Sequence, residues 1–363
     1  MLNAVKEQYM VSTYLIFYLI HSSQTGVGLL GFQKNIIQNA GYDAWISVIM
    51  AGLSLHLILW MILRMVRNPS KDLTDIHVIN FGKFLGNILS ILTIGYFFLL
   101  ALVVFRTYID VIQVWVFPML KTWELNIGLA IMIAYIISGG FRTITGISFF
   151  GVIIPSILLL MIFFPLQYAE IRNIIPVFNH SVVDLLKSSK SSSIIFIGFE
   201  ALLVYFPLIK DSSKTSKWAH AALGYTTLLY ALVTLVTFLY FSQGQLRHTL
   251  WPTLVMTKIV ELPFIERAEF IFIFAWLLVI LPAVCIPLWC CTRISKKIFK
   301  ITPRKSLFFF LAIIYICSLF INDRLKVDVL GSITSDIGFY FVYVYIPILF
   351  IFFLFRKNRI SKG

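Results

Sequence analysis

The chain has 363 residues, of which 60% are hydrophobic and only 13% are charged. Soluble globular domains contain about 45–50% apolar and about 25% charged residues, so this chain has too little polar surface to cover a water-facing globule. Its net charge of +14 is scattered between apolar stretches. We therefore interpret the charge as a topology signal and expect no nucleic-acid binding. Composition predicts an integral membrane protein embedded in the lipid bilayer.

Apolar stretches of about twenty residues recur without strand-like alternation, which favours an all-α bundle over a β-barrel. With the N-terminus in the cytoplasm, the inner segments carry more Lys and Arg than the outer ones, so we expect both termini to be cytoplasmic and the number of spans to be even. We predict one transmembrane domain, 1–363, with ten helices at 8–38, 44–65, 82–117, 125–140, 146–166, 192–210, 218–241, 267–291, 306–321 and 337–355.

The first predicted helix is interrupted at Thr25-Gly26-Val27-Gly28. Each glycine weakens a helix by about 1 kcal/mol relative to alanine. Within a membrane, backbone groups freed by such a break are tolerated where they line a cavity or meet a ligand. Free amides suit a carboxylate and free carbonyls suit an ammonium group, so a ligand site is one interpretation. Close helix packing through small residues is the other.

The sixth predicted helix carries Gly198-Phe199-Glu200 in its middle. An acid within a membrane helix must face the protein interior or water, so we expect Glu200 to hold a break in this helix, with a direct ligand role as the alternative. Interrupted helices at matching positions of two halves indicate an inverted-repeat transporter fold with a midplane site. The predicted repeats are 8–166 and 192–355.

Other polar and reactive groups give weaker signals. Arg106 and Asp110 stand four residues apart on the third helix, so we expect them to pair, either structurally or as an outer gate. The outer connection 242–266 should contain a short amphipathic helix at 254–259, lying on the outer face.

No P-loop, HExxH, GxSxG or metal-spaced His/Cys pattern occurs, so we expect no enzyme, metal or cofactor. The cysteines, expected to be buried without disulfides, are Cys285, Cys290, Cys291 and Cys317.

Several segments together resemble one known family. In order, they are GLLGFQKNIIQNAGYDAWIS (28–47), FGKFLGNIL (81–89), FPML (117–120), YIISGGFRTITG (135–146), IIPVF (174–178), GFEALLVYFPLIKD (198–211) and WPTLVMTKIVELPFIERAEFIFIFAW (251–276). They resemble the B subunit of spore germinant receptors, the spore germination permease-like branch of the amino acid/polyamine/organocation transporter superfamily. The resemblance implies a LeuT-like fold in the spore inner membrane, an A subunit and a C lipoprotein as partners, and a germinant that is commonly an amino acid.

The resemblance also implies a ligand site at the two breaks. Backbone at Thr25, Gly26, Val27 and Gly28 would meet the carboxylate, and carbonyls near Ile195 and Phe196 would meet the amine. Five side chains would contact the rest of the ligand: Tyr96, Leu100, Val104, Phe199 and Val284.

The chain departs from coupled transporters of the superfamily in two places. The fifth helix, 146–166, has no lysine, and 270–291 of the eighth helix has no hydroxyl to hold sodium. We therefore predict a nutrient-sensing receptor subunit, with an ion-coupled amino-acid permease as the alternative and a role in an ion-release path as a third hypothesis. The few polar residues in the inferred site favour a zwitterion with a small or apolar side chain.

Overall fold

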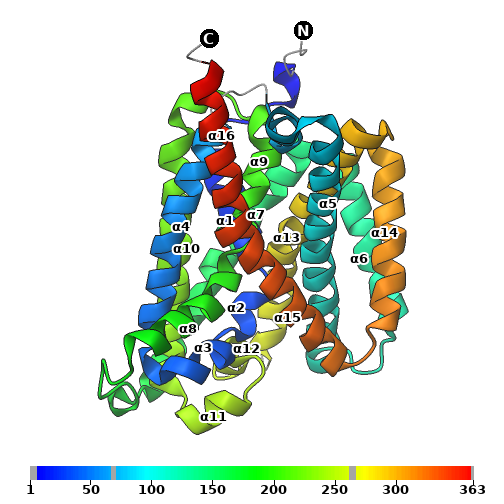
Figure 1. The fold of residues 1–363 in the computed structure, drawn as a ribbon. Coiled ribbons are helices and arrows are strands. Elements are labelled where there is room, and N and C mark those ends of the chain that lie inside the picture. The colour runs from blue at the N-terminus through cyan, green and yellow to red at the C-terminus, as the bar shows by residue number, and fades with distance from the viewer. Residues whose placement is uncertain (1–5, 67–70, 261–266, 361–363) are drawn as a thin grey trace.

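The computed structural model describes residues 6–66, 71–260 and 267–360, which form one helical bundle (Figure 1). An isolated β-bridge joins Val11 and Ile209. The helices are α1 (Leu15–Gln24), α2 (Gly28–Gly31), α3 (Gln33–Ala40), α4 (Ala44–Met65), α5 (Leu73–Trp115), α6 (Thr122–Ser138), α7 (Phe141–Leu158), α8 (Val182–Ser193), α9 (Leu202–Tyr205), α10 (Thr215–Tyr240), α11 (Gln243–His248), α12 (Pro252–Thr257), α13 (Ala268–Phe299), α14 (Pro303–Phe320), α15 (Arg324–Tyr340) and α16 (Ile346–Ile360).

The helices are those of a multi-pass membrane protein. Within the described residues, seven helices are long and apolar enough to cross a bilayer, and α8 with the segment after it adds an eighth span bent by 50°. The apolar helix α6 is shorter, and the first predicted span, 8–38, is divided among α1, α2 and α3. The all-α prediction is confirmed, whereas the total of ten spans stays a prediction.

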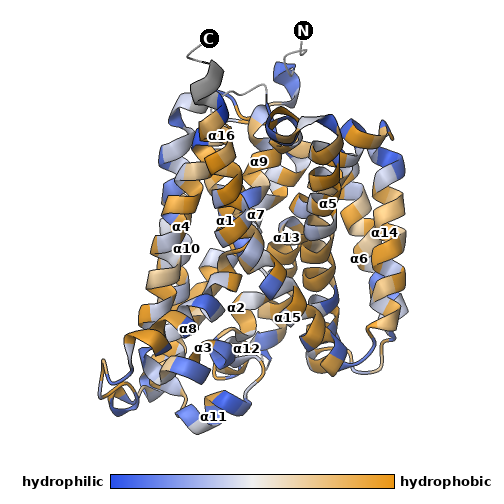
Figure 2. Ribbon diagram, in the orientation of Figure 1, coloured by the Kyte–Doolittle hydropathy of each residue, from blue (hydrophilic) through white to orange (hydrophobic). Residues whose placement is uncertain are grey.

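Hydrophobic residues make up most of the long helices (Figure 2), and many of them are exposed on the outside of the bundle. Tyr135 of α6 is 80% exposed and Phe84 of α5 is 78% exposed. Contiguous apolar surface of this extent is rare on soluble monomers, and here it runs along the long helices, where lipid tails would cover it.

Some helix bounds match the sequence prediction and others do not. Helix α4 has the predicted bounds. The first helix begins at Leu15 and not at residue 8, because Val11 is extended: its N–H donates to the Leu208 carbonyl, and its own carbonyl accepts the Lys210 N–H, both at 2.9 Å. Helix α5 begins before residue 82, and Gly82, with φ of 78°, kinks it there.

Two spans begin well before their predicted starts. The broken sixth span begins with α8 at Val182 rather than at 192, and the last span begins with α15 at Arg324 rather than at 337. This last span runs through a π-helical turn, Phe341–Tyr345, into α16. The short helix expected in the connection 242–266 is present as α12, but it is buried in the fold and does not lie on its surface.

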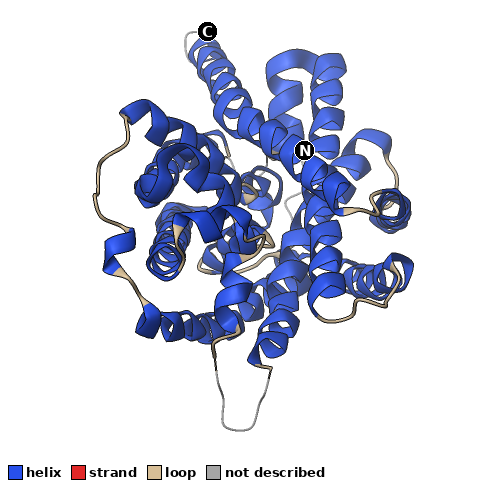
Figure 3. Ribbon diagram, turned by 90° about the horizontal axis from the view of Figure 1, so that it is seen from below, coloured by secondary structure: helices blue, strands red, loops and turns tan. Residues whose placement is uncertain are grey.

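Helix α13 lies in the middle of the bundle (Figure 1) and packs against α5, α7 and α14, while α4 packs against α10 and α8. Seen from below, the described chain consists of helices joined by loops (Figure 3). The described chain begins and ends at the same end of the bundle, and α2, α3, α11 and α12 lie at the opposite end (Figure 1). We call the first the terminal end and the second the distal end.

Candidate functional site

The break between α1 and α2 exposes backbone amides. Thr25 is extended, with φ of −92° and ψ of 130°. Tyr230 donates its hydroxyl to the Gln24 carbonyl at 3.1 Å, and Trp276 donates its indole N–H to the Gly26 carbonyl at 3.3 Å. Among the described residues, no group accepts a hydrogen bond from the N–H groups of 26–28. The break therefore has its carbonyls partly satisfied and three consecutive amides free.

The second break, at Ile197 and Gly198, requires its glycine for two reasons. Gly198 has φ of 122°, in the region that side-chain-bearing residues avoid. A Cβ atom there would overlap the carbonyl oxygen of Ser23 in α1. The backbones of the two interrupted helices therefore touch at this point.

Glu200 is hydrogen-bonded to the backbone of the second break. Its carboxylate oxygens accept the Gly198 N–H at 2.8 and 3.0 Å, and one of them also accepts the Tyr96 hydroxyl. Glu200 is fully buried. A buried carboxylate needs such donors, and the Gly198 amide would otherwise be unsatisfied in the membrane. This geometry favours the structural interpretation of Glu200.

A side-chain bond also ties the two breaks together. The Gln24 amide nitrogen at the end of α1 donates to the Phe196 carbonyl at 3.0 Å. Of the two carbonyls predicted to meet an amine, the one at Phe196 is thus already occupied, and Ile195 supplies the other.

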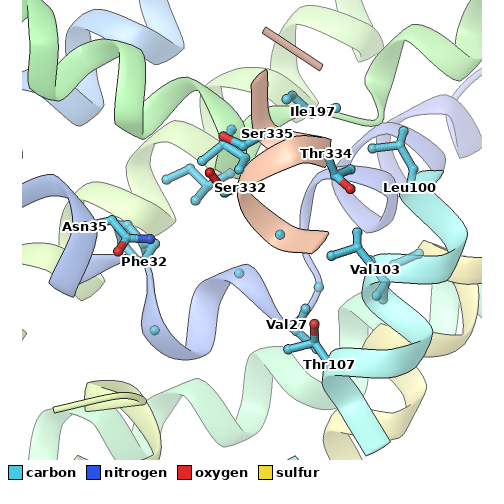
Figure 4. Close-up of a pocket in the computed structure, with 18 of the residues that line it drawn as sticks. Val27, Phe32, Asn35, Leu100, Val103, Thr107, Ile197, Ser332, Thr334 and Ser335 are labelled. Carbon is cyan, nitrogen blue, oxygen red and sulfur yellow. The ribbon is translucent and has the colours of Figure 1, made fainter. Parts of the chain in front are cut away.

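A cavity of about 620 Å³ lies beside both breaks. Figure 4 shows α15 between the α2–α3 segment and α5, with Ser332, Thr334 and Ser335 on it. Asn35 and Asp328 line the distal end of the cavity and are exposed, so the cavity opens there. Seven residues predicted for the site line it: Thr25, Gly26, Val27, Gly28, Leu100, Val104 and Ile195.

Four other predicted ligand contacts lie outside the cavity lining. Tyr96 is one turn too deep on α5, where its ring stacks on Phe341 with centroids 4.0 Å apart. Phe196 and Phe199 are fully buried in the core. Val284 is also buried, and its neighbours Ala283 and Pro287 face the cavity instead.

The sequence analysis missed the contribution of α15. Seven residues of this helix line the cavity, and several of them are polar. Helix α5 adds Val103 and Thr107, so its cavity-facing side is one turn nearer the distal end than we predicted. The α15 residues are Arg324, Val327, Asp328, Gly331, Ser332, Thr334 and Ser335.

The predicted Arg106–Asp110 pair is wrong. Asp110 pairs with Arg324 of α15, whose Nη1 lies 2.5 Å from its carboxylate. The buried Arg106 donates its Nε to the Ile321 carbonyl at the end of α14, also at 2.5 Å. The i, i+4 spacing allowed a pair on α5, but each group found a partner on the neighbouring α14–α15 segment.

Arg324 joins three elements at the distal mouth of the cavity. Its second guanidinium nitrogen lies 2.9 Å from Asp328, and its plane lies over the Trp251 ring, 4.8 Å from the centroid. Together with Asp110, these groups connect α5, α15 and the start of α12. A polar cluster at the outer mouth was expected, but its central member is Arg324, which the sequence analysis did not single out.

The architecture is that of LeuT-like membrane proteins, in which two interrupted helices meet beside a central cavity. The fold matches the crystal structure of MhsT in complex with L-phenylalanine, with a TM-score of 0.60, 13% sequence identity, and coverage of 94% of this chain and 97% of that one. The predicted LeuT-like fold is confirmed.

The sequence profile described as "Spore germination protein" matches residues 10–327. The chain is 39% identical to spore germination protein GerQB of Bacillus cereus, over 95% of this chain and 96% of that protein. It is 24% identical to spore germination protein YndE of Bacillus subtilis (strain 168), over 91% and 92% of the two chains. Identity to spore germination protein A2 of the same strain is 22%, over 97% of each. The chain belongs to the spore germination protein family, as its motifs indicated.

Proposed function

We propose that this protein is the nutrient-binding subunit of a spore germinant receptor and that it holds a small zwitterion at the break between α1 and α2. The observation that carries the proposal is the row of three free amides, Gly26 to Gly28, on the wall of the 620 Å³ cavity. Backbone amides at the start of a helical segment are favourable partners for a carboxylate. The family supports a role in germination, and MhsT supports an amino acid as the class of ligand.

The rest of the cavity suits the remaining parts of such a ligand. Ile195 lines the cavity and no described residue outside its own helical turn donates to its carbonyl, so this carbonyl is the proposed partner of the ammonium group. Val104 of α5 offers apolar contact, and Ser332 and Ser335 of α15 offer hydroxyls. The inner cavity wall carries no ionised side chain among the described residues, since Lys34, Arg324 and Asp328 line its distal part. We therefore propose a zwitterion with an uncharged side chain that is small, apolar or hydroxyl-bearing.

The residues near the broken helices fit a sensing role better than ion-coupled uptake. A coupling ion needs oxygen ligands, or a titratable cation in its place, near the broken helices. The segment 146–166 has no lysine, and 270–291 has no hydroxyl. The proposal includes an A subunit and a C lipoprotein as partners, the spore inner membrane as the location, and cytoplasmic termini. It also includes binding without chemical conversion of the nutrient.

Binding by the full-length purified protein in nanodiscs tests the proposal. Each standard amino acid is titrated singly, first in sodium and then with potassium in its place. We expect saturable binding of one or a few amino acids that does not change with the cation. Gly28→Val should abolish it, because the added methyl groups enter the space beside the free amides. Gly128→Val is the matched control, since a Cβ atom added to Gly128 on α6 would have no neighbouring atom within 4 Å.

Two results would contradict the proposal. If Gly28→Val bound the amino acid with the wild-type affinity, the free amides would not be part of the binding site. Binding that vanishes without sodium would favour the coupled permease. In spores that carry only this receptor, the bound amino acid should trigger germination, and Gly28→Val should prevent it at a normal protein level.

A further inference from the structure

A second cavity, of about 650 Å³, lies at the terminal end of the bundle. It is enclosed by the α6–α7 turn, the last turns of α13, the start of α14 and the chain just before α1. Its floor is apolar, with Phe141, Leu208 and Leu307 buried there. Its rim carries four cationic side chains from three helices: Arg142, Arg293, Lys296 and Arg304.

These four cations have no anionic partner within the described part of the chain. No carboxylate lines the cavity, and none of the four forms an ion pair with any described residue. The nearest counter-charge is Asp72, which pairs with Lys297 and acts on Arg293 only from beyond ion-pair distance. Nearby lysines differ in this respect: Lys210 lies 2.6 Å from Glu7, and Lys297 lies 2.7 Å from Asp72. Charges from separate helices that converge without neutralisation repel one another, so an anion at their centre would stabilise the arrangement.

The geometry leaves donors free to face such an anion. Arg142 gives one Nη1 bond to the Gln8 carbonyl, at 3.0 Å. Arg293 is half-buried, and its guanidinium carbon lies over the buried Trp289 ring, 5.3 Å from the centroid. A guanidinium that lies over a ring keeps its N–H edge available, and this planar edge matches phosphate oxygens. The start of α7 adds the positive end of an 18-residue helix.

We propose that this cavity binds the phosphate headgroup of an anionic phospholipid. Basic pockets between membrane helices, at the level of the headgroups, are the usual receptors for such lipids. The apolar floor offers contact to glycerol and acyl carbons, which a free phosphate ion would not use. Phe299 and Phe308, beside the rim, are 50% and 60% exposed, as expected for a surface that meets lipid.

Native mass spectrometry of the full-length protein tests the proposal. The protein is taken from nanodiscs of phosphatidylcholine alone, or of an equal mixture with phosphatidylglycerol, and the lipid retained after stripping is counted. We expect retention of phosphatidylglycerol in preference to phosphatidylcholine. Lys296→Gln and Arg304→Gln should each lower that retention about fivefold. Both residues are exposed and make no ion pair with a described residue, so the variants should fold. Lys305→Gln, one residue further along α14 and outside the lining, is the control of equal charge.

Three outcomes would overturn the proposal. One is equal retention of the two lipids by the wild type, a measurement that needs no variant. Another is retention by Lys296→Gln and Arg304→Gln at the level of Lys305→Gln. The third is displacement of phosphatidylglycerol by millimolar inorganic phosphate, which would assign the site to a soluble anion.

Discussion

The glycines of the two breaks serve different purposes. A Cβ on Gly28 would lie 3.8 Å from Ile195, an ordinary contact, and one on Gly26 would lie 3.6 Å from Ala283. Gly198 has a positive φ, whereas Gly26 and Gly28 do not. The first break therefore needs small residues to keep ligand space open, and the second needs a glycine to fold.

Gly198→Ala should destabilise the protein by about 1–3 kcal/mol through backbone strain alone, with the overlap on Ser23 adding to that cost. We expect a lower unfolding temperature of the purified protein and a lower level on immunoblots. Gly28→Ala should leave both unchanged, because its new methyl group has room. Equal stability of Gly198→Ala and wild type would show that the break does not have this geometry.

Asp110 and Arg324 should be energetically coupled. Asp110 is buried, so Arg324→Ala leaves a carboxylate without its cation. The double variant Asp110→Ala with Arg324→Ala should be less destabilised than the sum of the single changes, by about 0.5–3 kcal/mol. Thermal unfolding of the four proteins measures this difference. The destabilisations caused by Arg106→Ala and Asp110→Ala should be close to additive in the double variant. A coupling energy of equal size for these two residues would show that they do form an ion pair within α5.

At this scale the sequence predicted backbone features better than side-chain partners. The break at Thr25 to Gly28 follows from composition, because clustered glycines weaken a helix wherever they stand. The partner of Asp110 depends on where α14 ends and α15 begins, and nothing within α5 encodes that. The same limit applies to Tyr96, which reaches Glu200, a group on another span, and so points away from the cavity.

At the scale of elements, α15 supplies the polar wall of the cavity. Changing Ser332 and Ser335 together to alanine removes two hydroxyls that face the ligand space. If a hydroxyl-bearing nutrient is bound there, its affinity should fall about fivefold per lost hydrogen bond, while an apolar amino acid should be affected less. Val329→Ala, on the exposed side of the same helix, is the control. Binding titrations measure the change, and an unchanged ranking of amino acids would exclude α15 from selectivity.

The two spans whose starts the sequence misplaced most begin with α8 and α15, and both helices contribute residues to the cavity. Helix α4 is apolar along its predicted span, so the hydropathy pattern predicted both the first and the last residue of this helix correctly. Helix α8 ends in a row of serines, and α15 carries charged residues in its first turns, so both resembled loops. A helix that lines a wet cavity loses its hydrophobic signal on that side, and the same property marks it as part of the site.

At the scale of the whole molecule, the cavity should open to the outside of the cell. Lys and Arg are more frequent at the terminal end, which predicts that this end is cytoplasmic. Ser335→Cys should therefore react with a membrane-impermeant maleimide in intact cells, and a nutrient should protect it. Lys214→Cys, near the terminal end, should react only after permeabilisation. Cys285, Cys290 and Cys291 are buried, but Cys317, which was also expected to be buried, is half-buried. Both variants are therefore made in a Cys317→Ala background, and Cys317→Ala alone is the blank. The reverse pattern would place the cavity towards the cytoplasm.

The contact between Gly198 and Ser23 constrains how the protein transmits a signal. Close-packed backbones cannot shift independently, because no space separates them. A nutrient that draws the free amides of α2 around its carboxylate must move the end of α1, and that end carries Ser23 and Gln24. Through Gly198 and the Phe196 carbonyl, this displacement passes to the broken sixth span and to Glu200. If the nutrient binds as proposed, the two breaks should move together, and capture of its carboxylate at the first break should also shift Glu200 at the second.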